Sequence, residues 1–514
     1  MTHPIVTAIA LLAVVIGDQV SIAYNISPAP NVIYGEPAGR KNFPKVQSSF
    51  FGMTVLLTRD HIFIGAPRAQ SSSKRHLTIN EPGVIFRCDL RSAFCEQHTT
   101  LDGGGFESEV IKSGQYLGAT LDGTDDGAEI VACAPRMIKG GDEERAMTGI
   151  CYTEVNGTTR AQRQAFNYQH QSFAFDTALE GFAVHLLRRP DDSLEVVTGL
   201  PNCNYTGAMM IYGEDRETGV YLTSEKLKRN GYFGYSVNSM TVQNKTIYLV
   251  SAPRFNGENG KVFLFEKVIT SRWKAEMKLH IVLGGDESQI DYFGYSLCTE
   301  DVNGDGLTDV LIGAPFYSEN LINDGGAVYV FLNKGLNDDE VLRLEKQIVL
   351  KSTYVGSGQF GYAIALIGDI NYDGYNDVAI GAPFEESGRV YIFHGGPEGL
   401  LPQPVQSLES SGNSQPFAMF GASIARGVDV DENSYNDIAV GAPAEDKVYL
   451  FKTYPIVRPK VEMTVSKRFL AISDTTTELG ANNFVVDKCS IEICYYFESL
   501  GNFQANEHYG RSGR

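Results

Sequence analysis

The fold is decided by the stretch YFGYSLCTEDVNGDGLTDVLIGAP, residues 292–315. It opens with an aromatic-glycine pair, Phe293-Gly294, passes through an acidic loop, and ends in a β-type run that stops at Gly313-Ala314-Pro315. A glycine beside the aromatic residue lets two backbones approach closely, and a proline ends a strand without needing a ladder donor. The stretch is therefore expected to form two short strands of one sheet, joined by a polar loop.

The same pattern recurs seven times, most degenerately in the third copy. The copies are Phe51-Gly52 with Gly65-Ala66-Pro67, Leu117-Gly118 with Cys133-Ala134-Pro135, Gly181-Phe182 with Gly199-Leu200-Pro201, Phe233-Gly234 with Ser251-Ala252-Pro253, Phe293-Gly294 with Gly313-Ala314-Pro315, Phe360-Gly361 with Gly381-Ala382-Pro383, and Phe420-Gly421 with Gly441-Ala442-Pro443. Another β-type run follows each turn, and four strands per repeat make a propeller blade. We expect an all-β fold, a seven-bladed β-propeller, whose last blade is completed by a strand from the segment 24–33.

Copies five, six and seven also contain the loops DVNGDGLTD, DINYDGYND and DVDENSYND, which begin at Asp301, Asp369 and Asp429. Side-chain oxygens at positions 1, 3, 5 and 9, with the main-chain carbonyl of position 7, form the hard-oxygen shell that Ca²⁺ prefers. The expected ligands are Asp301, Asn303, Asp305, Leu307, Asp309, Asp369, Asn371, Asp373, Tyr375, Asp377, Asp429, Asp431, Asn433, Tyr435 and Asp437. One such loop alone is also typical of a solvated acidic turn, but three at the same place in three repeats favour metal binding.

These loops are not EF-hands, because Ile312, Ile380 and Val440 stand where an EF-hand needs its glutamate. About three Ca²⁺ ions are expected, with a structural role, since carboxylates this close repel one another unless a cation lies among them. The third loop departs from the others by carrying Ser434 in place of a glycine. Chelation is expected to lower the melting temperature.

Several features predict passage through the secretory pathway. Residues 1–23 hold an apolar stretch with small residues at its end, which is typical of a cleaved signal peptide; a buried N-terminal strand is the alternative. Eight cysteines in such a chain indicate disulfides. Three pairs are close enough to bridge locally: Cys88 with Cys95, Cys133 with Cys151, and Cys489 with Cys494. Cys203 and Cys298 form either a long-range bridge or two unpaired thiols. The glycosylation sequons begin at Asn25, Asn156, Asn204 and Asn244.

Composition and motifs exclude some function classes. The formal net charge of -19 argues against nucleic acid as a partner. The sequence contains no HExxH motif, no GxSxG elbow and no phosphate-cradling glycine loop followed by lysine. We therefore do not expect an enzyme.

The seven FG-GAP repeats, with DxNxDGxxD-type loops in the last three, resemble the head of an integrin alpha subunit over residues 24–452. Residues 453–514, which begin near Tyr454-Pro-Ile-Val and include Cys489 and Cys494, resemble the start of the Ig-like thigh β-sandwich of that family. Fragment, short isoform and gene-model error all remain open for this ending. FG-GAP propellers are also appended to a secreted phospholipase, but that enzyme needs a catalytic domain ahead of the first blade.

The resemblance implies a cell adhesion receptor glycoprotein that pairs with a beta subunit and binds an extracellular-matrix ligand. In the family, a basic side chain of the beta subunit is caged by aromatic rings at the propeller centre. The matching residues are Tyr116, Tyr235, Tyr295 and Tyr362. The full-length form would lie at the cell surface in a membrane heterodimer. The alternative is a secreted, free-standing calcium-binding propeller or decoy adhesion module, because no later apolar run reaches the roughly 20 residues that span a bilayer.

Two departures bear on the ligand. The segment joining copies two and three is too short for the inserted ligand-binding domain that some family members carry. Members that bind Arg-Gly-Asp have an aspartate at the position of Arg229, and a cation there would repel the arginine of such a ligand. A laminin-like matrix protein is therefore favoured over Arg-Gly-Asp, as in an insect-type member, while the identity of the ligand and of the beta subunit stays open.

Overall fold

The computed structural model describes residues 25–37, 48–74, 76, 78–101, 110–140, 145–161, 177–213, 219–223, 227–255, 259–271, 274–285, 291–319, 323–410, 417–455, 459–464 and 492–497. The chain divides into two compact units, and the first ends at Tyr454. The described helical elements are two 3-10 turns, η1 (Thr99–Leu101) and η2 (Cys203–Tyr205). None of the described segments is a helix with the length and apolar character needed to cross a membrane.

Seven four-stranded antiparallel sheets build the first unit, which confirms the predicted seven-bladed propeller. Blade one consists of β2 (Thr54–Leu57), β3 (His61–Ala66), β4 (Val84–Asp89) and β5 (Cys95–Gln97). Blade two consists of β7 (Thr120–Gly123), β8 (Glu129–Ala134), β10 (Ile150–Val155) and β11 (Thr158–Ala161). Blade three consists of β12 (Val184–Arg188), β13 (Leu194–Leu200), β14 (Ala208–Tyr212) and β15 (Gly219–Leu222). Blade four consists of β16 (Val237–Val242), β17 (Lys245–Ala252), β18 (Lys261–Ser271) and β19 (Lys274–Leu283).

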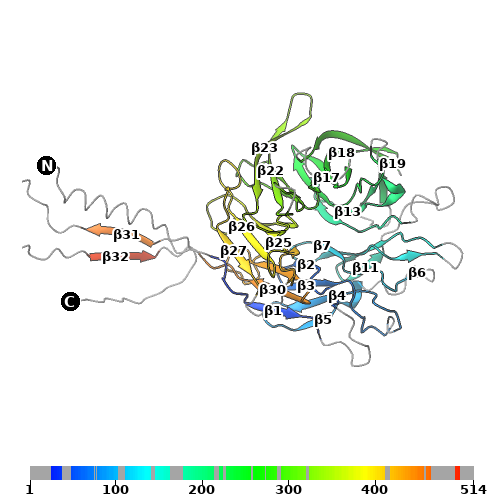
Figure 1. The fold of residues 1–514 in the computed structure, drawn as a ribbon, viewed down its shortest axis with the longest axis horizontal. Helices are drawn as coiled ribbons and strands as arrows, with labels where there is room; N and C mark the ends of the chain where they lie inside the picture. Colours follow the sequence, from blue (N-terminus) through cyan, green and yellow to red (C-terminus); the bar gives the residue numbers. More distant parts are fainter. Residues whose placement is uncertain are drawn as a thin grey trace, which may run out of the picture. The chain divides into compact units, whose positions relative to one another are not determined.

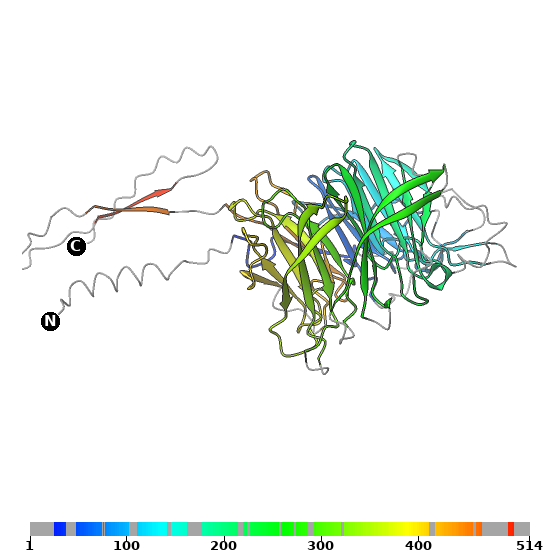
Figure 2. The same ribbon diagram turned by 90° about the horizontal axis from the view of Figure 1, so that it is seen from above.

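The remaining blades follow the same order. Blade five consists of β20 (Leu297–Glu300), β21 (Asp309–Ala314), β22 (Ala327–Leu336) and β23 (Leu342–Lys351). Blade six consists of β24 (Ala363–Gly368), β25 (Asp377–Ala382), β26 (Arg389–Phe393) and β27 (Gln406–Glu409). Blade seven is β28 (Ser423–Ile424), β29 (Ile438–Ala442), β30 (Lys447–Phe451) and β1 (Val32–Gly35). A two-stranded sheet pairs β6 (Val110–Ile111) with β9 (Ile138–Lys139). Figure 2, turned by 90°, shows strands of neighbouring blades running side by side.

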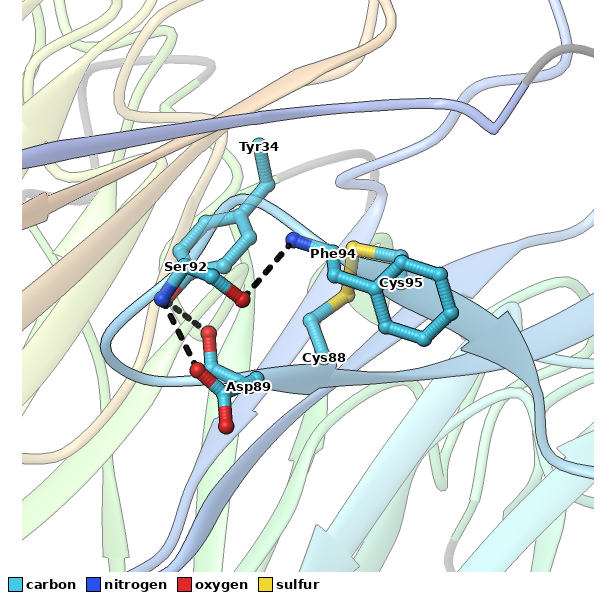
Figure 3. The surroundings of a disulfide bond; sticks show 6 residues. All are labelled: Tyr34, Cys88, Asp89, Ser92, Phe94 and Cys95. Carbon is cyan, nitrogen blue, oxygen red and sulfur yellow. Dashed lines mark hydrogen bonds between the residues drawn. A yellow bond between two sulfur atoms is a disulfide. The ribbon is translucent and has the colours of Figure 1, made fainter.

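The ring is closed by the first strand of the chain, as predicted. β1 pairs with β30, Val32 opposite Leu450, so blade seven contains both ends of the propeller sequence. In Figure 1 the blue of β1 lies beside the orange of β30 for this reason. The Tyr34 hydroxyl donates to the Asp89 carbonyl at 3.1 Å. Figure 3 shows Tyr34 in the surroundings of the Cys88–Cys95 disulfide. The closing strand is thereby tied to blade one as well as to blade seven.

The core lies between blades. Seven clusters of buried apolar residues each contain residues from two adjacent blades, including blades seven and one. The motif aromatics belong to these clusters; Phe293 is fully buried, and its ring meets the Tyr329 ring edge-on at 5.0 Å between centroids. Burying one such side chain contributes about 1.5 to 3 kcal/mol. The aromatic of the motif therefore holds neighbouring blades together.

The motif glycine is required by close backbone contact between blades. Gly52 has φ of +92°, and a Cβ placed on Gly441 of blade seven would lie 2.1 Å from its carbonyl oxygen. No side chain fits at such a distance, so both positions need glycine. This contact joins blade seven to blade one and explains why the turn glycine and the motif glycine recur together.

The structure corrects the alignment of the third repeat. The residue equivalent to the other motif glycines is Gly181, with φ of +81° and its amide donating to the Gly199 carbonyl. The residue before it is Glu180, which occupies the buried aromatic position and accepts a hydrogen bond from the Tyr212 hydroxyl. The pair predicted as Gly181-Phe182 is therefore wrong, and Phe182 follows the glycine.

In the second unit, β31 (Pro459–Thr464) pairs antiparallel with β32 (Glu492–Phe497). An Ig-like sandwich over residues 453–514 stays a prediction. The signal peptide at 1–23 and Cys489 lie outside the described residues, and Cys494 is described only as part of a strand.

Candidate functional site

Three loops join the first and second strands of blades five, six and seven. Asp309 and Asp377, at loop position 9, are the first residues of β21 and β25, and Asp437 directly precedes β29. Each loop is thus anchored at its end by a buried carboxyl group. The structure places all three predicted calcium loops at the same end of their blades.

The carboxylate at position 1 shapes each loop by accepting main-chain amides of the turn. Asp301 accepts from Gly304 at 2.8 Å, from Asp305 at 3.2 Å and from Gly306 at 2.8 Å. Asp369 and Asp429 accept the amides of positions 5 and 6 in the same way. Side-chain hydrogen bonds of aspartate to amides a few residues ahead favour tight turns. One residue type at position 1 therefore explains the shared loop geometry.

Positions 3 and 5 are brought together by the same turn. The Asn303 amide donates to Asp305 at 3.0 Å, and the Asn371 amide donates to Asp373 at 2.8 Å. In the third loop, one oxygen each from Asp429, Asp431 and Asp437 lies within 4.8 Å of the others. Positions 3 and 5 thus meet in the first two loops, and in the third loop positions 1, 3 and 9 gather in one place.

The position 9 carboxyl groups carry an electrostatic strain. Burial raises the pKa of Asp309 to about 7 and the pKa of Asp377 to about 8. Hydrogen bonds from main-chain amides lower both pKa values, and the neighbouring loop carboxylates raise both. Burial likewise raises the pKa of Asp437 to about 7. A buried carboxylate among like charges is stabilised by a cation. An all-oxygen donor set with this strain fits a hard divalent ion, so the residues present are suited to Ca²⁺.

The third loop differs from the others in several ways, and one is that Asp431 and Asn433 exchange the asparagine and aspartate of positions 3 and 5. The Lys452 ammonium lies 2.8 Å from an Asp431 oxygen, so a side chain of the protein already neutralises part of the site. Ser434 adopts φ of +72°, where Gly306 has +81° and Gly374 has +94°. The loop keeps the turn around position 1, since the amides of Asn433 and Ser434 donate to Asp429, but the Asn433 side chain donates to the Thr453 carbonyl instead of meeting position 3.

The three loops also contact one another. The Asn376 amide of the second loop donates to the Asp301 carbonyl of the first at 3.1 Å. The Tyr372 hydroxyl donates to the Ser434 carbonyl of the third loop at 2.5 Å, and its ring meets the Tyr435 ring at 4.5 Å. Order in one loop therefore supports order in the next.

The opposite end of the blades, where the turn prolines of the seven repeats lie, is called the motif face. Tyr235, Tyr295 and Tyr362 each follow a motif glycine and form a continuous row of rings, 5.3 Å and 4.8 Å apart between centroids. Phe182 extends the row, 4.9 Å from Tyr235. Sequence reasoning missed Phe182 because the third repeat was misaligned by one residue. The row of these four rings is called the ring row.

Tyr116 does not belong to the ring row. It lies two residues before its motif glycine, and the Arg136 guanidinium covers its ring at 4.6 Å. The structure therefore separates Tyr116 from the other three tyrosines predicted for the beta-subunit interface. Arg229 lies 4.7 Å from the Tyr205 ring and is exposed.

The predicted covalent features divide as follows. Cys88–Cys95 and Cys133–Cys151 are disulfides, as predicted. Cys203 and Cys298 lie in separate blades as buried thiols, and burial raises the pKa of each to about 12. Asn156, Asn204 and Asn244 are exposed, and their glycosylation stays a prediction. Asn25 is buried, with its amide donating to the Ile370 carbonyl, which does not suit a glycan at that nitrogen.

Comparisons with known proteins agree with the geometry. A family model described as the FG-GAP repeat matches residues 293–331, 360–393 and 420–454. Integrin alpha-PS3 and integrin alpha-PS5 of Drosophila melanogaster are 34% and 36% identical over 89% and 87% of this chain. Integrin alpha-7 of Rattus norvegicus is 30% identical over 88% of the chain. The chain spans 45%, 45% and 41% of these three relatives, less than half of each.

Proposed function

Because the chain carries the FG-GAP propeller head of an integrin alpha subunit, we propose that it is the ligand-binding head of a cell adhesion receptor and pairs with an integrin beta subunit. The observation that carries this proposal is the ring row, Phe182, Tyr235, Tyr295 and Tyr362, on the motif face. Aromatic faces attract a desolvated cation by about 2 kcal/mol. A basic side chain of the beta subunit is the occupant that suits this row.

Co-expression with a beta-subunit ectodomain in Ca²⁺-containing medium tests the pairing. The full chain should be secreted as a stable complex, and Tyr235→Ala with Tyr295→Ala should abolish it. Tyr235→Phe with Tyr295→Phe keeps both ring faces and should retain the complex. Phe94→Ala, at an exposed ring outside the ring row, is the control. A well-folded chain that ignores every beta subunit would instead support a free-standing calcium-binding propeller, which closure of the ring by β1 makes structurally self-sufficient.

Calcium is proposed as a structural ion of the three loops. At a free Ca²⁺ concentration tenfold above the dissociation constant, each site would contribute about 1.4 kcal/mol to stability. Chelation with EDTA should lower the melting temperature by several degrees, and isothermal titration should detect about three sites. An unchanged melting temperature would contradict a structural role. Asp309→Asn should reduce the number of sites without removing the others.

The ligand is proposed to be a laminin-like matrix protein in preference to an Arg-Gly-Asp protein. Arg229 supports this, because its exposed guanidinium would repel a ligand arginine. Adhesion of cells that display the heterodimer should therefore be stronger on laminin than on an Arg-Gly-Asp peptide surface. Arg229→Asp is the variant expected to weaken that preference. The proposed location is the cell surface, and no enzymatic activity is proposed for this head.

A further inference from the structure

Arginines on the motif face are distributed unevenly around the ring. The residue after the turn proline is Arg68 in blade one, Arg136 in blade two and Arg254 in blade four, whereas it is Phe316 in blade five and Phe384 in blade six. Arg229, in the segment that enters blade four, adds a fourth cation. The four residues Arg68, Arg136, Arg229 and Arg254 are called the arginine arc. At this position blade three has Asn202 and blade seven has Ala444, so the arc draws on blades one, two and four of a chain whose net charge is -19.

Equivalent main-chain contacts show that three members occupy one repeat position. The amides of Arg68, Arg136 and Arg254 donate to the carbonyls of Ser49, Gln115 and Gly231, at 3.1, 3.1 and 3.3 Å. In each case the acceptor directly precedes a residue with positive φ, two positions before the motif glycine. Equivalent positions of propeller blades lie on the same face. The side chains of these three arginines therefore leave the backbone at the same level of the motif face.

Each guanidinium of the arc lies over an aromatic ring. Arg136 lies 4.6 Å from the centroid of Tyr116, and Arg229 lies 4.7 Å from that of Tyr205. Arg254 covers Tyr232 at 5.2 Å, and Arg68 covers Phe50 at 5.5 Å. Stacking leaves the N–H groups at the edge of a guanidinium available for bidentate contact with a carboxylate. Because the side chains are already ordered, binding such a group costs less conformational entropy.

Two members are suited to meet a partner directly. Arg136 and Arg229 are both exposed, and within the described part of the chain neither has a carboxylate at salt-bridge distance. Arg68 differs, because Glu81 lies 3.1 Å from its Nε. Exposed cations held in place without an internal counter-charge are complementary to an acidic surface. A long polyanion suits the arc less well, because the rest of this acidic chain would repel it.

We propose that the arginine arc binds an acidic peptide segment of the extracellular ligand. This inference rests on the proposed function, since it assigns the arc to the ligand and the ring row to the beta subunit. Carboxylates of the segment would take bidentate hydrogen bonds from Arg136 and Arg229, and its apolar side chains would lie against the rings of Tyr116 and Tyr205. The arc would therefore select a ligand segment with negative charge, whereas an Arg-Gly-Asp ligand presents the positive charge of its arginine.

Binding of a fluorescent octaglutamate peptide tests the arc, with excess Ca²⁺ present and with the chain both alone and in complex with a beta-subunit ectodomain. The complex should bind the peptide with an affinity that falls as salt rises. Arg136→Gln with Arg229→Gln should weaken binding about tenfold, since two exposed charge pairs of modest strength are lost. Arg91→Gln with Arg343→Gln makes the same charge change at two exposed arginines outside the arc and should leave binding unchanged.

Each other outcome overturns a stated part of the reasoning. If both double variants weakened octaglutamate binding equally, the effect would come from net charge alone, and the arginine arc would not be a binding site. Preference for a heparin oligosaccharide over octaglutamate would overturn the peptide assignment. Binding by the isolated chain that is lost in the complex would assign the arc to the beta subunit and overturn the ligand assignment. If no complex forms but the isolated chain binds octaglutamate through the arc, the proposed heterodimer fails and the arc stands.

Discussion

Replacing Ser434 with glycine should stabilise the propeller. Position 6 of each calcium loop lies in the left-handed region, with φ of +81° at Gly306, +94° at Gly374 and +72° at Ser434. The amides of all three residues make the same contact, donating to the position 1 aspartate at 2.7 to 2.8 Å. The third loop therefore holds an L-residue in a backbone conformation that its two relatives give to glycine.

The expected gain follows from two opposing terms. A residue with a Cβ in the left-handed conformation costs about 1 to 2 kcal/mol. Glycine offsets part of this gain, because the greater conformational freedom of the unfolded glycine chain lowers the stability of the folded state by about 0.5 to 1 kcal/mol. Ser434→Gly should therefore stabilise the head by about 0.5 to 1 kcal/mol. Gly306→Ala and Gly374→Ala should cost about the same amount, because a Cβ at either position meets no atom within 4 Å and only the backbone is strained.

Urea unfolding followed by circular dichroism, in EDTA and again with Ca²⁺, measures these differences. The midpoint should rise for Ser434→Gly and fall for both alanine variants in each condition. The argument from backbone strain would be refuted if Ser434→Gly unfolded at the same urea concentration as the unchanged protein and if neither alanine variant lowered the midpoint. A gain that appears only with Ca²⁺ would move the cause from the backbone to the ion.

Three further predictions concern the loops and the closure of the ring. Lys452→Ala removes the ammonium 2.8 Å from Asp431 and should tighten Ca²⁺ binding at the third loop roughly fivefold by isothermal titration, whereas Lys346→Ala, at an exposed lysine of β23, should not. Tyr372→Phe removes the hydroxyl that donates to Ser434 and should cost about 1 kcal/mol in thermal unfolding, because the ring contact with Tyr435 is kept. Gly441→Ala should cost about 3 kcal/mol or more, since its Cβ would lie 2.1 Å from the Gly52 carbonyl, while Gly35→Ala, with no atom within 4 Å, should be nearly neutral. Equal melting temperatures for the two alanine variants would contradict the role of this contact in ring closure.

Much of the fold was predictable because its constraints are local in sequence. A motif glycine, a turn proline and the strands between them lie within one repeat, so the blades and their number could be counted. The turns of the three acidic loops were predictable for the same reason, since position 1 orders its own turn, and calcium binding there stays a prediction. The disulfides Cys88–Cys95 and Cys133–Cys151 also close short spans.

The features that escaped prediction depend on contacts between distant residues or on a substituted motif. Glu180 replaces the aromatic of the third repeat, so Gly181 and Phe182 looked like an inverted pair and the ring row lost a member. Nothing local in the sequence links Arg136 to Tyr116, because the pair meets only when the turn after β8 lies beside the segment before β7. Tyr116 was therefore grouped with rings that it does not join.

The two sets of proposed functional residues lie at opposite ends of the blades. Asp309 begins β21, and Ala314 ends it one residue before the turn proline, so the six-residue strand separates loop from motif face by about 17 Å. Calcium bound as proposed in the loops would therefore hold blades five to seven together without touching the proposed partner on the motif face. Partner binding should then respond to chelation only as the folded fraction falls, and a loss of binding by a fully folded, calcium-free head would require a conformational link along these strands.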